Sequence, residues 1–282
     1  MGRLKVACVQ MSAVNEVAAN LDAAEALIRK AAADGAKFVV TPENTTIIEP
    51  NRPVALAKSL PEETHPGLPR FTALARELKI WLLIGSMSIR VEPARMANRS
   101  FLIDDQGRIV ARYDKIHMFD VDLANGESYR ESAVMRPGAQ AILAPTPWGP
   151  LGMTVCYDMR FPHLYRNLAQ AGAVMISVPS AFTVPTGKAH WHVLLRARAI
   201  EAGAFILAPA QCGEHAAGRK TYGHSLIVSP WGEIIAEAGE TPGTIAAEID
   251  FSEVQKARAM IPSLDHDRDY ARPSPELRVA GE

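Results

Sequence analysis

The amino-acid sequence predicts an α/β fold in which two similar halves form a four-layer α-β-β-α sandwich. Segments with strand-like and helix-like periodicity alternate along most of the 282 residues, and their order repeats. Residues 172–179 correspond to residues 35–42, and residues 225–236 correspond to residues 100–111. Two matches in the same order indicate two related halves. Sheets that carry helices on one face would then pack together through their other faces.

The first half is expected to begin with a buried strand and to alternate strands with helices. We expect strands at residues 4–11, 38–40, 80–89, 101–103 and 109–111, and helices at residues 17–33 and about 69–78. A proline-rich loop fills the segment up to about Pro69, and Asp104-Asp105-Gln106-Gly107 is typical of a hairpin turn. Residues 113–138 lack periodicity, and a loop of that length in a compact domain is usually functional.

The second half contains a cysteine at an unusual place. Residues 151–155 alternate like a half-buried strand that runs up to Cys156, and Pro162 opens a helical pattern that ends near Gly172. In a turn between a strand and a helix, unsatisfied backbone N–H groups would favour the thiolate. A free cysteine is most often a small buried apolar residue, so this turn alone leaves both interpretations open. The later elements are expected at residues 188–201 (helix), 204–209 (strand) and 225–236 (hairpin).

Length and composition indicate an ordinary globular protein. We expect a single domain over residues 1–282, of which residues 262–282 form a charged C-terminal tail. The net charge of −1 provides no electrostatic argument for binding nucleic acid or an anionic membrane. The sequence shows no signal peptide or transmembrane stretch, and its three scattered cysteines form no disulfide framework. These observations favour a cytoplasmic protein that acts on a small molecule.

Three polar residues stand just beyond apolar strands. They are Glu43, Lys115 and Cys156. Acyl transfer needs a nucleophile, a group that takes and returns its proton, and a positive donor for the oxyanion. A thiol, a carboxylate and an ammonium supply these three parts. Taken singly, however, Glu43 and Lys115 would be interpreted as solvated surface charges.

Three segments resemble the signature segments of the nitrilase (carbon–nitrogen hydrolase) superfamily. They are residues 42–44 (Pro-Glu-Asn), 113–117 (Tyr-Asp-Lys-Ile-His) and 155–162 (Val-Cys-Tyr-Asp-Met-Arg-Phe-Pro). The resemblance extends from the first strand to about Asp250. Within the superfamily the chain looks most like the Nit branch, the deaminated glutathione amidases, through residues 179–182, 189–191, 194–201, 210–213 and 222–225. One departure is His163, where the family commonly has glutamate.

The resemblance implies an α-β-β-α sandwich, usually dimeric, with a catalytic triad of Glu43, Lys115 and Cys156. A supporting glutamate maps best onto Glu131, with Glu127 as the alternative, and the backbone N–H of Tyr157 would help to hold the oxyanion. No cofactor is implied. The implied reaction converts deaminated glutathione to 2-oxoglutarate and cysteinylglycine through a thioester. The alternative substrates are 2-oxoglutaramate, as for an ω-amidase, and another small amide or an N-carbamoyl compound.

Some assignments stay open at this point. The substrate-binding candidates are Arg160, Phe182 and Arg198, and the sequence does not rank the basic candidates Arg160, Lys188, Arg198 and Arg219 for a substrate carboxylate. A Cys–His hydrolase is a rival, because His117, His163, His190, His192 and His224 are available. A metal site at His190 and His192 is disfavoured, since helix residues two apart face different directions. A non-catalytic binding or scaffold protein of the same fold is the third possibility.

Overall fold

The computed structural model describes residues 2–124 and 126–271, and its centre consists of two six-stranded sheets. The first sheet has the order β16-β1-β2-β3-β4-β5, with β1 (Arg3–Gln10), β2 (Phe38–Val40), β3 (Trp81–Glu92), β4 (Arg95–Ile103), β5 (Ile109–Asp114) and β16 (Gly243–Asp250). The second has the order β15-β14-β11-β10-β9-β8, with β8 (Ile142–Ala144), β9 (Leu151–Met153), β10 (Met175–Ser177), β11 (Phe205–Ala208), β14 (Leu226–Val228) and β15 (Ile234–Glu237).

The two sheets repeat the same topology. In the first sheet β2 pairs in parallel with both β1 and β3, and β4 and β5 follow antiparallel. In the second sheet β10 pairs in parallel with both β9 and β11, and β14 and β15 follow antiparallel. The segments that correspond in sequence therefore occupy corresponding strands, and the prediction of two related halves is confirmed. The halves also interlock, because the late strand β16 pairs with β1 at the edge of the first sheet.

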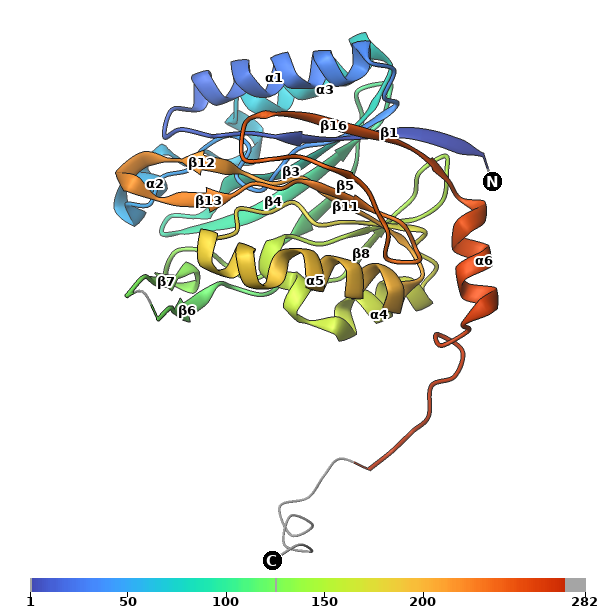
Figure 1. Ribbon diagram of the computed structural model, residues 1–282. Helices are drawn as coiled ribbons and strands as arrows, with labels where there is room; N and C mark the ends of the chain where they lie inside the picture. Colours follow the sequence, from blue (N-terminus) through green and yellow to red (C-terminus); the bar gives the residue numbers. More distant parts are fainter. Residues whose placement is uncertain (1, 125, 272–282) are drawn as a thin grey trace, which may run out of the picture.

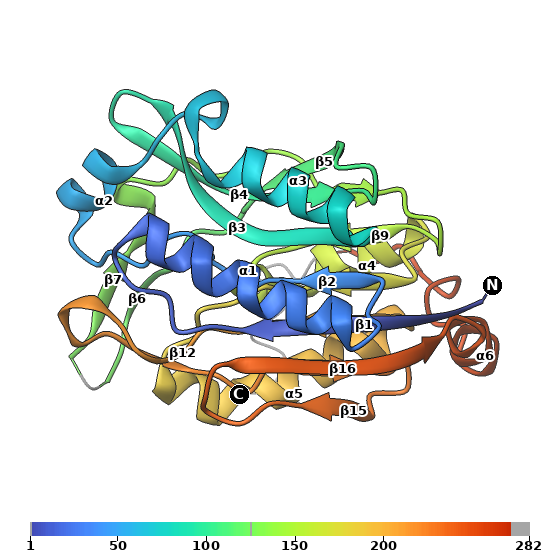
Figure 2. The same ribbon diagram turned by 90° about the horizontal axis from the view of Figure 1, so that it is seen from above.

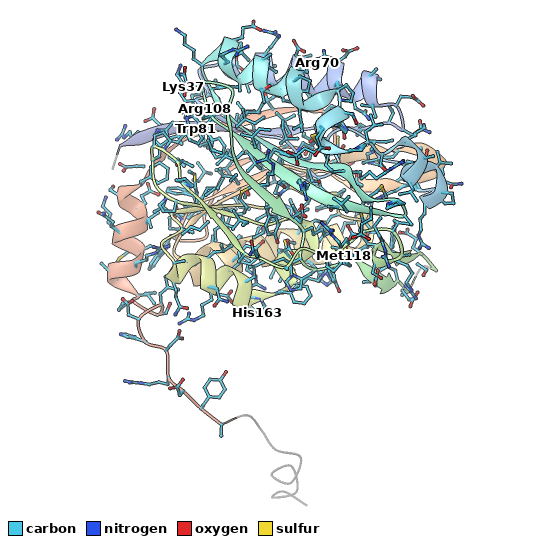
Figure 3. The ribbon with its side chains drawn as sticks, turned by 180° about the vertical axis from the view of Figure 1, so that it is seen from behind. Lys37, Arg70, Trp81, Arg108, Met118 and His163 are labelled. Atoms are coloured by element: carbon cyan, nitrogen blue, oxygen red, sulfur yellow. The ribbon has the colours of Figure 1, made fainter. Side chains whose placement is uncertain are left out.

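Helices cover the outer face of each sheet. In Figure 1, α1 (Val17–Ala33) and α3 (Gly67–Leu78) lie above the first sheet, while α4 (Pro162–Gln170) and α5 (Val184–Ala202) lie below the second. Figure 2 shows α1 and α3 side by side across the strands. In Figure 3, Arg70 of α3 and His163 of α4 mark opposite outer faces of the molecule. The predicted four-layer α-β-β-α sandwich is confirmed.

Strand β1 shows how the sequence builds two hydrophobic cores. Side chains alternate across a strand, so neighbouring residues point to opposite faces of the sheet. Leu4, Val6 and Cys8 belong to the core that includes both sheets, whereas Ala7 and Val9 pack in the core beneath α1 and α3. A strand that is buried on both faces reads as a continuous apolar run, which is the pattern that predicted it.

Two predicted loops are more ordered than expected. The proline-rich segment contains α2 (Arg52–Lys58) and a 3₁₀ turn, η1 (Glu62–Thr64), and α3 begins at Gly67. The side chain of Asn51 accepts a hydrogen bond from the backbone N–H of Val54, so the short helix is capped. Residues 113–138 contain the hairpin β6 (Asp120–Asp122) and β7 (Ser128–Arg130) and the turn η2 (Glu131–Ala133). The expectation of long irregular loops at these two places is wrong.

The remaining elements lie at the edges of the sandwich. Strands β12 (Cys212–Glu214) and β13 (Lys220–Tyr222) form a hairpin that encloses the turn η4 (Ala216–Gly218). Helix α6 (Ser252–Met260) lies at one end, and the chain then runs away from the body (Figure 1). Gln170 of α4 donates to the carbonyl of Leu264, at 3.0 Å, so the start of the predicted tail is fixed to α4. Residues 272–282 of that tail lie outside the described residues. No helix in the described part of the chain is long and apolar enough to cross a membrane.

Gly85 of β3 is tightly enclosed by the segments that follow β2 and β10. A Cβ atom there would lie 1.8 Å from the carbonyl oxygen of Thr41 and 2.6 Å from Cβ of Pro179. We expect Gly85→Ala to lower the free energy of unfolding by about 3 kcal/mol or more, because neither backbone segment has room to move. Urea denaturation measures this change. At the control position Gly239, a Cβ would meet no atom within 4 Å, so a similar loss in Gly239→Ala would contradict the steric explanation.

Candidate active site

Cys156 lies in a sharp turn that follows β9. The strand ends at Met153, and the 3₁₀ turn η3 (Cys156–Arg160) precedes α4. The backbone N–H of Cys156 donates to the carbonyl of Pro179, which follows β10, at 2.9 Å. Cys156 has a φ of +50°, a left-handed conformation that is unusual for a non-glycine residue and occurs at functional sites. The second sheet thus holds the thiol just beyond the ends of two parallel strands.

Lys115, which follows β5, forms the centre of a buried charge cluster. Its ammonium lies 2.9 Å from Oε1 of Glu43 and 2.8 Å from Oε2 of Glu131. The side chain of Lys115 is only 2% exposed, so its charge must be paired, and both carboxylates contact it. The amide of Asn98 in β4 donates to both glutamates, at 2.9 Å and 3.3 Å. The backbone N–H of Phe119 donates to Oε2 of Glu131, the oxygen nearer to Lys115, at 2.7 Å.

Glu43 connects this cluster to Cys156. The residue follows β2, and its Oε2 accepts a hydrogen bond of 2.9 Å from the backbone N–H of Ala181 in the second half. The carboxylate is also close enough to Cys156 for its negative charge to raise the pKa of the thiol, and both residues line the same cavity. Gln211 donates to the backbone carbonyl of Glu43, at 3.0 Å. The base candidate is therefore held from both sheets, between an ammonium and a thiol.

The electrostatics of the cluster favour a neutral thiol beside an ionised carboxylate. Burial opposes the ionised form of Glu43, but the charge of Lys115 and the hydrogen bonds from Cys156 and Lys115 lower its pKa. Burial likewise opposes the charge of Lys115, whose pKa Glu131 and Glu43 nevertheless raise well above its usual range. Burial and the negative charge of Glu43 raise the pKa of Cys156 far above that of a free thiol. The backbone N–H groups of the turn favour the thiolate, but burial and Glu43 outweigh both them and the favourable charge of Lys115.

A second buried carboxylate fixes the nucleophile relative to Lys115. Asp158, two residues after Cys156, is fully buried and accepts a hydrogen bond of 2.6 Å from the hydroxyl of Tyr113. Asp158 also accepts a hydrogen bond of 3.0 Å from the backbone N–H of His117. Its Oδ1 lies 2.7 Å from Nδ1 of that histidine. Tyr113 and His117 flank Lys115 in the sequence. One side chain of the cysteine turn therefore holds the segment that carries the lysine on both sides.

The cluster opens into a cavity of about 690 Å³. The predicted residues that line it are Glu43, Lys115, Glu127, Glu131, Cys156, Tyr157 and Phe182, together with Arg219, which the sequence did not rank. Between the two possible supporting glutamates, only Glu131 contacts Lys115 in the described structure.

Two of the predicted substrate-binding arginines do not line this cavity. Arg198 is buried behind it, donating to the carbonyl of Met159 at 2.9 Å and pairing with Glu201 at 2.6 Å. The guanidinium of Arg160 lies over the rings of Tyr157 and Phe182, 5.8 Å and 5.7 Å from their centroids. The structure therefore does not support Arg198 as a substrate ligand. It places Arg160 behind the aromatic wall.

Asn98 is the site residue that the sequence analysis missed. The sequence offered one signal for this residue. Asn98 is an amide side chain in a strand that also contains Met96, Ala97 and Phe101. Its side chain is buried, and its Oδ1 has no hydrogen-bond partner in the described part of the chain. A buried polar group that is only partly paired costs free energy, which is typical of a residue kept for its role in a site.

The predicted histidines are not part of the cavity lining. None of the residues that line the cavity in the described structure is a histidine, which argues against the rival Cys–His hydrolase. His190 and His192 do not come together; His192 instead joins His224 and Glu237, and their ligand-type atoms lie within 4.8 Å of one another. Both histidines lie 2.9 Å from the same carboxylate oxygen of Glu237, so hydrogen bonding accounts for this cluster.

Comparisons with known proteins agree with this geometry. The sequence model of the carbon–nitrogen hydrolase family matches residues 5–259. A deaminated glutathione amidase from Yersinia enterocolitica is 40% identical over 280 residues, which cover 98% of this chain and 97% of the relative. The crystal structure of the Caenorhabditis elegans NitFhit protein superposes with a TM-score of 0.87 at 36% identity, covering 95% of this chain and 66% of that longer one.

Saccharomyces cerevisiae Nit3, whose structure is described as a member of branch 10 of the nitrilase superfamily, is similar over nearly its whole length. It superposes with a TM-score of 0.83 at 30% identity, and the match covers 93% of this chain and 95% of Nit3. Family sequence pattern, full-length relatives and fold agree with one another. The chain therefore belongs to the carbon–nitrogen hydrolase family.

Proposed function

We propose that the protein is an amidase that cleaves a C–N bond through a cysteine thioester. The observation that carries this proposal is the buried cluster in which Glu43 lies 2.9 Å from the Lys115 ammonium, while Glu43, Lys115 and Cys156 all line one cavity. Because Glu43 is ionised and the thiol is neutral, one proton can move from Cys156 to Glu43 as sulfur attacks the amide carbon. Deprotonation in the attack step removes the need for a resting thiolate.

The oxyanion requires donors that are already in place. As the S–C bond forms, the carbonyl π electrons move to oxygen, where Lys115 and the backbone N–H of Tyr157 are the donors that border the cavity. Glu43 then gives its proton to the nitrogen, the C–N bond breaks and the amine leaves. Water attacks the thioester, Glu43 takes its proton, and the C–S bond breaks as Cys156 recovers a proton. Glu131 supports these steps by holding Lys115.

We propose deaminated glutathione as the substrate, hydrolysed to 2-oxoglutarate and cysteinylglycine in a metabolite-repair reaction. Two observations support it. The relative from Yersinia enterocolitica bears the name of that amidase and covers almost the whole chain. The cavity of about 690 Å³ is in the range that holds drug-sized ligands, and is therefore large for an acyl group of five carbons alone. The short alternative, 2-oxoglutaramate, shares the keto-acid end and lacks the peptide part.

Measuring kcat/KM for both compounds distinguishes deaminated glutathione from 2-oxoglutaramate as the preferred substrate. We expect deaminated glutathione to be preferred by at least about tenfold, because contacts to the peptide part contribute about 1.4 kcal/mol or more to transition-state binding. Released cysteinylglycine and ammonia measure the two reactions. A preference for 2-oxoglutaramate, or for an N-carbamoyl compound, would refute the glutathione assignment and leave the amidase proposal standing.

We also propose a homodimer in the cytoplasm. The outer face of α5 exposes Val193 and Ile200, 67% and 52% accessible, and Trp231 adds a further apolar side chain that is 50% accessible. Exposed apolar residues of this kind are typical of surfaces that bind a partner. All three cysteines are unpaired, as a reducing compartment requires. Light scattering of the purified protein measures the oligomeric state, and a monomer would refute the dimer.

A further inference from the structure

We propose that Arg219 binds the carboxylate at the acyl end of the substrate and thereby selects amides of keto-dicarboxylic acids. The inference rests on the proposed amidase function and deepens it. Arg219 stands between η4 and β13 and lines the cavity. One of its terminal nitrogens lies 3.3 Å from the carbonyl oxygen of Ala181. The backbone N–H of that same alanine donates to Glu43, so the guanidinium lies one residue away from the base.

The guanidinium has an unused donor. Its Nε is buried and makes no hydrogen bond in the described part of the chain. Within the described residues, no carboxylate forms an ion pair with Arg219, whereas the neighbouring cavity residue Arg130 pairs with Asp122 at 2.7 Å. An arginine that lines a cavity while keeping a donor unpaired is poised for an anionic ligand, since a carboxylate accepts two parallel N–H bonds from such a group.

Aromatic contact holds the guanidinium in place. Its central carbon lies 5.8 Å from the ring centroid of Tyr129 in β7. The hydroxyl of this tyrosine donates a hydrogen bond of 2.7 Å to Glu127, so the carboxylate of Glu127 is engaged by Tyr129. A planar guanidinium stacked on a ring loses little freedom when it binds a carboxylate, because its orientation is already fixed.

The other basic candidates are occupied or distant. Arg198 pairs with Glu201, and Arg160 lies over two aromatic rings outside the cavity lining. Lys188 is exposed on α5 and does not line the cavity. Among the four basic residues that the sequence left unranked, Arg219 is the one that borders the same space as Cys156.

The spacing fits a keto-dicarboxylic acyl group. The backbone N–H of Ala181 donates to Glu43, which lines the cavity together with Cys156, and Arg219 donates to the carbonyl of the same alanine. One residue of chain spans about 3.3–3.8 Å. In 2-oxoglutarate amides the carbon of the free carboxylate is four bonds from the scissile carbonyl carbon. In an extended zigzag of bonds of roughly 1.5 Å, the two carbons lie about 5 Å apart. A substrate of this length can place its two ends at the thiol and at the guanidinium.

Selectivity between two small amides tests the inference. For the wild type and Arg219→Gln, we compare kcat/KM for 2-oxoglutaramate with kcat/KM for pentanamide, which has the same chain length and no charge. We expect the ratio to fall by about a hundredfold in Arg219→Gln, mostly through KM, because a desolvated charge pair is lost. Arg219→Lys is expected to recover part of the kcat/KM ratio, since lysine keeps the positive charge but cannot donate two parallel hydrogen bonds to a carboxylate. Lys188→Gln, the matched control, is expected to keep the wild-type ratio.

A binding measurement separates this inference from the chemistry. In the Cys156→Ala background, calorimetry gives the Kd of the keto-acid product 2-oxoglutarate with and without Arg219→Gln, and thermal melting checks that both variants fold. We expect Arg219→Gln to weaken binding by about a hundredfold. If the wild type hydrolyses 2-oxoglutaramate but Arg219→Gln leaves both the kcat/KM ratio and the Kd unchanged, the role of Arg219 is overturned. The proposed amidase function would then still stand. Failure of the wild type to hydrolyse any amide would overturn the proposed function as well.

Discussion

Replacing Cys156 by alanine is expected to lower amide hydrolysis at least about ten-thousandfold, because removal of the nucleophile leaves no route to the thioester. The stability of the variant is expected to change by no more than about 1 kcal/mol, since the substitution removes one small atom from a site that borders a cavity. Ammonia or amine release measures the activity, and urea denaturation measures the stability.

Cys212→Ala is the matched control. Cys212 is also buried and unpaired, but it lies at the start of β12 and does not line the cavity. Its variant is expected to keep activity within about threefold of the wild type. If Cys156→Ala retains most of the activity, the thioester mechanism is wrong. Intact mass after mixing the wild type with a slow amide distinguishes the scaffold alternative, which would accumulate a thioester and never release it.

Local patterning singled out three candidate residues because each follows an apolar strand. Glu43 follows the apolar run of β2, Lys115 follows β5, and Cys156 follows β9. The internal repeat predicted that loops at the strand ends of both halves meet at one edge. The assignment of the three residues as a catalytic triad came from the resemblance of their segments to a known family, since patterning alone left Glu43 and Lys115 as surface charges.

The partners of the triad depend on contacts between distant parts of the chain. Asn98 meets Glu43 across 55 residues of sequence and Glu131 across 33, and nothing near Asn98 indicates either contact. Strand β16 pairs with β1 from the other end of the chain, so local patterning did not predict its place. The ionisation of Cys156 likewise depends on a distant contact, because the turn around it carries no sign of the negative charge of Glu43, which only the folded chain brings near.

Lys115→Ala is expected to lower kcat by at least about a hundredfold, the scale of losing an oxyanion donor. It is also expected to lower the free energy of unfolding by about 3–5 kcal/mol, because removing one partner leaves buried carboxylates without a compensating charge. Both Glu43 and Glu131 contact the ammonium within 3 Å, and Asn98 would then face two unbalanced carboxylates. The two losses must be separated before Lys115 is assigned a role in the chemistry.

The double variant that combines Lys115→Ala with Glu131→Gln separates the loss of activity from the loss of stability. Adding Glu131→Gln to Lys115→Ala removes one of the two uncompensated carboxylates, so part of the lost stability is expected to return. The activity is expected to stay low, because neither glutamine nor alanine supplies a cation to the oxyanion. Urea denaturation and kcat are measured on the wild type, both single variants and the double variant. If kcat recovers together with stability, Lys115 serves only to neutralise the buried glutamates. If stability recovers while kcat stays at least about a hundredfold low, the ammonium acts on the reacting atoms, as the proposed mechanism expects of a lysine that lines the same cavity as Cys156.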